Sequence, residues 1–126
     1  MYHTLLPLVA ALLTATGAFG AVVCGTARGA YPLANVVLQR SKPVAGRSVE
    51  EASLVVQISS AEGDDSETAY LATLELLATA KAALHDARLP GIAARKLQAN
   101  SIETLRVEST GEMVYFIPVT VLFDAA

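Results

Sequence analysis

The side chains that could carry chemistry are few in this sequence, and their spacing matches no catalytic arrangement. The chain holds two histidines, His3 and His85, and a single cysteine, Cys24. Neither histidine has a cysteine, histidine or carboxylate at metal-ligand spacing. His85 stands beside Asp86 at the end of a predicted helix, where a histidine compensates the helix dipole. The sequence therefore predicts no catalytic residue, no cofactor and no enzyme activity.

Two further patterns could bind ions. Four acids precede or begin a predicted helix: Glu62, Asp64, Asp65 and Glu67. They could hold Ca²⁺, but they lack the alternating ligands of a calcium loop, and acids stabilise a helix N-terminus without any metal. Residues 20–26 have the glycine spacing of a phosphate-binding loop but contain no lysine. We therefore predict neither a metal site nor a nucleotide site.

The composition favours a chain whose surface is covered by other subunits. Hydrophobic residues make up 53% of the sequence and charged residues only 17%, whereas soluble domains usually carry about 25% charged residues. The net charge is -3, and the basic residues are scattered, without a cluster that could grip phosphates. We expect one domain, spanning residues 1–126, that assembles with copies of itself.

The first part of the chain carries no charged side chain before Arg28. As a helix, residues 5–24 would be long enough to cross a bilayer. No basic residue precedes the apolar run, which is atypical of a signal peptide. We expect a core helix and no membrane association, and a signal or anchor formed by residues 1–24 is the alternative. Cys24 is expected to be a small buried side chain.

Residues 4–16 form the first predicted helix. Thr4 can cap it, Pro7 falls in its first turn, and Gly17 can end it in the left-handed conformation. Its core face is apolar at helical spacing: Leu5, Leu8, Val9 and Leu12, with Leu6 and Leu13 beside them. The opposite face is small and uncharged, where a monomer would usually carry Lys or Glu. Pro7, Ala11 and Thr14 are therefore candidate subunit contacts.

Short strands follow the first helix. Residues 21–24 and 35–39 are short and rich in β-branched side chains, and residues 52–59 alternate with period two. Val36, Val37 and Leu38 are expected to lie in the sheet, because burying such side chains is worth about 1.5–3 kcal/mol each.

A polar segment at about residues 40–51 separates two of these strands. It is longer than a tight hairpin turn. Pro43 is expected to block strand pairing, and Arg40, Lys42 and Arg47 to meet acids on an adjacent subunit or ring. We interpret the segment as an arm that becomes ordered against a neighbour; a solvated loop is the alternative.

A second helix and a hairpin complete the chain. Asp64 or Ser66 can cap the helix, and Pro90 stops it. Its predicted core stripe consists of Tyr70, Leu74, Leu77 and Leu84. Residues 101–108 and 113–123 form the hairpin. Pro118 cannot donate a ladder hydrogen bond, so the last strand is predicted to lie at a sheet edge or to pair irregularly, and Pro118 is a further candidate subunit contact.

The order of these elements predicts an α+β fold, with a single mostly antiparallel sheet packed with two main helices. The stretches that define the layout are the leucine-rich first helix, GAYPLANVVLQ, SLVVQISSAEGDDSETAYLATLELLATAKAAL and EMVYFIPVTVLFDA. Together they resemble the tail terminator, or tail completion, proteins of long-tailed bacteriophages. The resemblance covers nearly the whole chain and is one of layout, without an invariant motif.

The resemblance implies a structural protein of the virion, assembled in the host cytoplasm. Such proteins form a ring, usually a hexamer, at the head-proximal end of the tail tube. The ring ends polymerisation of the tail tube protein and presents a docking face to the head-tail connector protein. A head-tail neck protein and a small envelope-anchored domain are the alternatives.

DNA passes through such a ring without specific binding, so we expect acids and not bases on its inner surface. Five acids are candidates for that lining: Glu50, Glu51, Glu62, Asp64 and Asp65.

Overall fold

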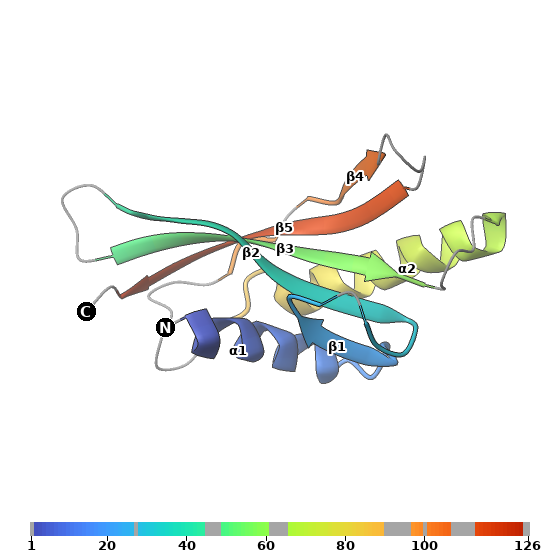
Figure 1. Cartoon of the computed structure of the whole chain (residues 1–126), viewed down its shortest axis with the longest axis horizontal. Coiled ribbons are helices and arrows are strands. Elements are labelled where there is room, and N and C mark those ends of the chain that lie inside the picture. The colour runs from blue at the N-terminus through green and yellow to red at the C-terminus, as the bar shows by residue number, and fades with distance from the viewer. Residues whose placement is uncertain are drawn as a thin grey trace.

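The computed structural model describes residues 2–26, 28–44, 49–60, 66–89, 97–99, 101–106 and 113–124. Its elements in chain order are α1 (Tyr2–Thr14), β1 (Ala21–Cys24), β2 (Leu33–Pro43), β3 (Val49–Ser59), α2 (Glu67–Leu84), β4 (Glu103–Arg106) and β5 (Met113–Asp124) (Figure 1). The chain has the predicted α+β fold, with one mostly antiparallel sheet and two helices.

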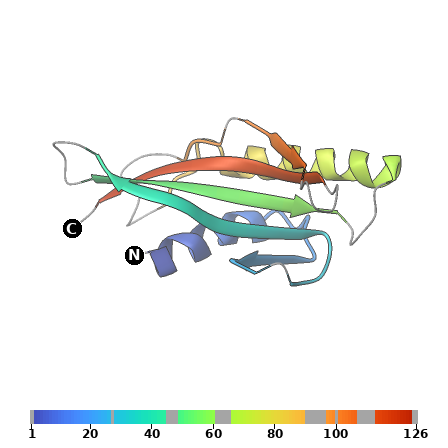
Figure 2. The ribbon, with the colours of Figure 1, turned by 45° about the horizontal axis from the view of Figure 1, so that its top comes forward.

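The strands form one sheet in the order β1-β2-β3-β5-β4. β1 runs parallel to β2, and the other neighbouring pairs are antiparallel. Figure 2 shows the strands side by side, with both helices behind them. The helices therefore cover one face of the sheet. The other face, which we call the open face, is covered by no helix among the described residues.

The alternation of side chains along the central strands decides which face is buried. Buried residues alternate with half-buried ones: Ala52, Leu54, Val56 and Ile58 on β3, and Ile117, Val119 and Val121 on β5. Successive strand residues point to opposite faces, so this whole set lies under the helices. The predicted period-two strand at residues 52–59 is confirmed.

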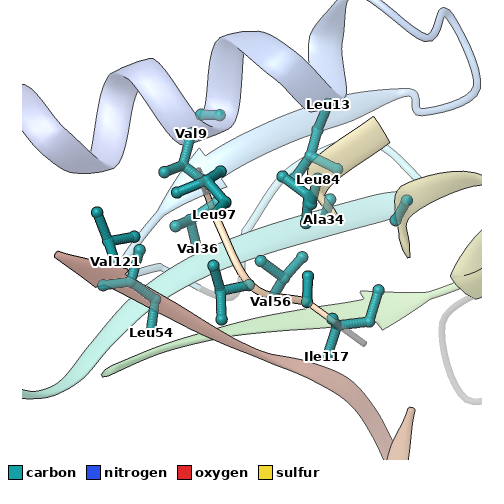
Figure 3. Close-up of a cluster of buried hydrophobic side chains, with 14 of the residues drawn as sticks. Val9, Leu13, Ala34, Val36, Leu54, Val56, Leu84, Leu97, Ile117 and Val121 are labelled. Carbon is teal, nitrogen blue, oxygen red and sulfur yellow. The ribbon is translucent and has the colours of Figure 1, made fainter. Parts of the chain in front are cut away.

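α1 packs on the covered face through one side only. Leu5, Val9 and Leu13 are fully buried, as the sequence predicted. Figure 3 shows Val9 and Leu13 directed toward the strands, with Leu84 and Leu97 among them. Side chains from residues far apart in the sequence therefore close a single core between the helices and the sheet.

The two ends of α1 differ in how well they were predicted. The helix begins at Tyr2, earlier than expected, so Pro7 lies inside it and not in its first turn. A proline there removes one helical hydrogen bond, but Pro7 is exposed, where water can satisfy the freed carbonyl. Gly17 has φ of 70°, which confirms the predicted left-handed end of the helix.

Of the two residues predicted to cap α2, Ser66 is the N-cap. The Ser66 hydroxyl accepts a hydrogen bond from the N–H of Ala69 at 3.1 Å, which satisfies one free donor of the first turn. The buried stripe consists of Ala69, Thr73, Leu77, Ala80 and Leu84. The prediction that Tyr70 belongs to the core was wrong, because Tyr70 is 46% exposed. Its ring packs instead at the sheet margin, 5.9 Å from the ring of Tyr115.

The segment at residues 40–51, predicted to be an arm or a solvated loop, is strand at residues 40–43 and 49–51, so the prediction that Pro43 blocks strand pairing was wrong. β2 continues to Pro43, which pairs with Glu50, and Lys42 pairs with Glu51. β1 pairs with β2 only as far as Val36. The charges and the proline therefore lie where β2 has one strand neighbour, a position at which both are tolerated. Arg47 lies outside the described residues.

One extra residue in β2 interrupts the alternation of side chains between the two faces of the sheet. Leu38 and Arg40 pair with consecutive residues of β3, so Gln39 is the extra residue of a β-bulge. Leu38 shares the covered face with Val36. After the bulge, Arg40 is opposite Ser53, and both Arg40 and Lys42 lie on the open face.

β5 lies between β3 and β4, and not at the edge of the sheet as predicted. β4 reaches only Phe116, and Gln98 bridges Thr120 through two backbone hydrogen bonds of 3.0 and 2.9 Å. The Thr120 N–H bonds Gln98 and therefore points away from β3. Backbone N–H groups two residues apart in a strand point to the same side, so the nitrogen of Pro118 also points away from β3. The missing donor of Pro118 therefore costs no bond to β3.

We expect Leu54→Ala to destabilise the folded chain by about 2–5 kcal/mol, because Leu54 is fully buried beneath the helices. The matched control is Ser53→Ala, one residue earlier on the open face, which should change stability by less than about 1 kcal/mol. Urea denaturation followed by circular dichroism measures both. Equal losses in the two variants would contradict the assignment of the faces.

Candidate assembly surfaces

The residues that suggested chemistry have structural surroundings. His85 is the C-cap of α2, as predicted, and its N–H bonds the carbonyl of Lys81 at 2.8 Å. The Nδ1 of His85 accepts the N–H of Ala99 at 3.1 Å, while Nε2 lies 3.8 Å from the Asp86 carboxylate. The ring thus connects the end of α2 to the segment at residues 97–99.

The two other candidate ion sites were the glycine-spaced residues 20–26 and the four acids at residues 62–67. Residues 21–24, between the glycines that suggested a phosphate loop, form the strand β1. No three His, Cys, Asp or Glu side chains come together within the described ranges. Glu62, Asp64 and Asp65 lie outside those ranges, so a site formed by the four acids is not described. The absence of enzyme activity remains a prediction.

Cys24 is exposed, so the prediction that it is buried was wrong. It is the last residue of β1, a strand at the edge of the sheet with one neighbouring strand. Partial burial still raises the pKa of its thiol above the ordinary value, because desolvation disfavours the thiolate. The side chain is therefore accessible but protonated at neutral pH.

The centre of the open face is apolar. Val37, Val55 and Pro118 form one row across three strands, and Phe116 lies beside Pro118 on the same face of β5. All four are half-buried, although no helix in the described part of the chain covers them. These side chains form an apolar patch on a sheet face that the described helices leave uncovered.

A small hollow interrupts the open face near β1. It has a volume of about 90 Å³ and is lined by Tyr31, Leu33, Asn35, Gln57 and Ser59. Asn35 is only 7% exposed, and its Oδ1 accepts the N–H of Gly25 at 2.9 Å. This amide therefore holds the turn after β1 against the sheet, which is a structural role.

The most prominent feature is an arm formed by residues 40–43, 49–51 and 122–124. Figures 1 and 2 both show these ends of β2, β3 and β5 running past the first turn of α1. The Lys42 ammonium lies 3.9 Å from the Glu51 carboxylate, and the Ser41 hydroxyl donates to Glu50 at 3.2 Å. Arg40, Lys42 and Pro43 are exposed. Within this chain the arm is an extension of the sheet, and its predicted contact with a neighbour remains a prediction.

The predicted subunit contacts on α1 are on its outer side. Pro7, Ala11 and Thr14 are exposed, and the Thr14 hydroxyl is turned back to the carbonyl of Ala10 at 3.0 Å. These three side chains are small and uncharged, as predicted for the outer side of the helix. Pro118, by contrast, is half-buried on the open face, so it belongs to a different surface from the other three.

Two of the candidate lumen acids, Glu50 and Glu51, lie within the described residues. They are neighbours on β3 and therefore point to opposite faces of the sheet. The lumen assignment stays a prediction for Glu50 and Glu51, and its remaining residues lie outside the described ranges.

The sequence reasoning missed an exposed stripe on α2, which consists of Glu67, Leu71 and Glu75. All three are exposed, and Leu71 is 56% exposed. They are spaced four residues apart and so lie along one side of the helix. That spacing was visible in the sequence, but it identifies a surface only once the core residues of α2 are known.

Within the described ranges, no helix has the length and apolar character needed to span a membrane. Comparison with known proteins gives no family: no protein-family model and no curated protein matches this chain.

We expect Cys24 of the folded protein to react with a thiol reagent such as 5,5′-dithiobis(2-nitrobenzoic acid) without denaturant, because the side chain is exposed. Its rate at pH 8 should be lower than that of the urea-unfolded chain, since its raised pKa leaves less thiolate in the folded state. Raising the pH should bring the two rates together. No reaction before unfolding would contradict the exposed position.

Proposed function

We propose that this chain is a structural subunit that assembles with copies of itself into a ring at the head-proximal end of a bacteriophage tail tube. The ring ends growth of the tube and offers a docking face to the head-tail connector. The observation that carries the proposal is the arm, which extends past the helices and bears charged residues that the core does not need.

The exposed surfaces support self-assembly. Three separate areas carry apolar or uncharged side chains without a cover among the described residues: the open face around Phe116, the outer side of α1 around Ala11, and the neighbourhood of Leu71 on α2. Each subunit in a closed ring meets two neighbours and the rings or tubes above and below it. Such a subunit needs several contact areas, whereas an enzyme of this size needs one cleft.

The phage assignment rests on the resemblance of the layout to tail terminator proteins. The observed order of elements agrees with that layout: a leucine-rich helix, strands, an acid-capped helix and a closing apolar strand. The resemblance supplies the partners, which are the tail tube protein on one side and the connector on the other. It also supplies the proposed location, the virion.

The test is tube growth in the presence and absence of this chain. The tail tube protein of the same virus is polymerised with and without purified chain, and tube lengths are measured by electron microscopy. Bound rings at one end and shorter, uniform tubes are expected. Unchanged tube lengths with no density at either end would contradict the proposal. Rings that join heads to tails without limiting tube length would make the chain a neck protein.

A second expectation concerns DNA. A ring through which DNA slides should not hold it, because each firm Lys or Arg contact to a phosphate adds to affinity. We expect no retention of double-stranded DNA at about 0.15 M salt in a filter-binding assay, and no more than weak retention at about 0.05 M. Binding that persists at the higher salt would contradict a DNA-conducting role.

A further inference from the structure

Two groups of exposed charges of opposite sign lie on different parts of the described chain: Arg40 and Lys42 on the arm, and Glu67 and Glu75 on the exposed stripe of α2. Within the described ranges, Lys42 lies 3.9 Å from Glu51 and the His85 ring lies 3.8 Å from Asp86. Arg40 on the arm, and Glu67 and Glu75 on the exposed stripe of α2, take part in neither pair. Glu67 also interacts favourably with the dipole of the helix it begins, but Glu75, in the third turn, has no such role.

The two groups have complementary charges and similar spacing. Arg40 and Lys42 are two residues apart on one face of β2, about 7 Å along the strand. Glu67 and Glu75 are eight residues apart on α2, about 12 Å along the helix axis. The long side chains of arginine and lysine can spread to meet the wider pair. Leu71 lies between the glutamates, where the aliphatic parts of those side chains would cover it.

The two groups cannot meet within one subunit. Figure 1 places the arm at the left end of the molecule and the first turns of α2, which hold the stripe, at the right end. A contact between them must therefore join two molecules, and it joins different surfaces of the two. Contacts of this heterologous kind repeat from one copy to the next and generate a ring when the rotation closes.

We propose that the arm of one copy binds the exposed α2 stripe of the next, with Arg40 and Lys42 facing Glu67 and Glu75 around Leu71. The occupant of the stripe is a second copy of this chain. The inference rests on the self-assembly part of the proposed function and not on the tail tube. It also gives the ring a direction, because each arm binds the next copy in the same sense around the ring.

Charge reversal tests the contact. The arm variant carries Arg40→Glu and Lys42→Glu, and the stripe variant carries Glu67→Lys and Glu75→Lys. Each variant alone places like charges together in every contact, so the concentration at which half of the chains are assembled should rise at least about tenfold. Native mass spectrometry and light scattering of the purified chain measure this.

Mixing the two variants is the decisive step. In a mixture, the reversed arm of one variant meets the reversed stripe of the other, and the natural arm meets the natural stripe. Assembly should return with the variants alternating, and hence with an even number of subunits. A single chain carrying all four substitutions should also assemble, this time without alternation. Failure of both the mixture and the fourfold variant to assemble would overturn the contact.

Two controls keep the result interpretable. Glu103→Lys reverses an exposed charge on β4, outside the proposed contact, and should leave assembly unchanged. Because Lys at position 67 opposes the helix dipole, Glu75→Lys alone serves as a second stripe variant, and circular dichroism checks that each variant folds. A stripe variant that assembles like the unaltered chain would also overturn the proposal. No tail tube is present, so this outcome is separate from the tube assay.

Discussion

The structure depends on the register of β3. This strand pairs with β2 on one side and with β5 on the other along almost its whole length, and its even-numbered side chains from Ala52 to Ile58 form the floor of the core. A slip of one residue would bring Ser53, Val55 and Gln57 under the helices instead. α2 packs on β3 and β5, and α1 packs on β1 and β2, whose pairing β3 aligns, so the register decides which face of the sheet the helices cover.

The same constraint explains why the open face remains apolar in its middle. Val55 lies on β3 between two buried residues and next to Val37 and Pro118. The sheet has two faces, but the two helices in the described part of the chain lie on only one of them. A protein that kept this face in water would be expected to place polar residues there. Its apolar centre therefore fits a chain whose surface is completed by assembly.

Much of the fold followed from local patterns. The alternation at residues 52–59 identified a one-sided strand, Gly17 identified the end of α1, and Ser66 identified the start of α2. These are features in which neighbouring residues determine the outcome. The fold class followed from the order of the elements.

The errors have a common origin in long-range pairing. The segment at residues 40–51 was not predicted to be strand, because Pro43 and the charges disfavour strands locally, whereas pairing with β3 outweighs that preference. Pro118 suggested an edge strand, because the sequence does not show that its nitrogen points away from β3. Tyr70 has the helical spacing of a core residue but lies at the margin of the sheet, against Tyr115. The exposed stripe on α2 went unnoticed because a surface is defined only once the core is known.

The bulge at Gln39 has an evolutionary consequence. In a regular strand, one inserted residue would move every later side chain to the opposite face of the sheet. Here the bulge absorbs the extra residue, so Arg40 lies opposite Ser53 and Lys42 opposite Glu51, as they would in a strand without Gln39. A lineage can therefore gain or lose one residue at this point while the buried residues before it and the charged residues after it keep their faces.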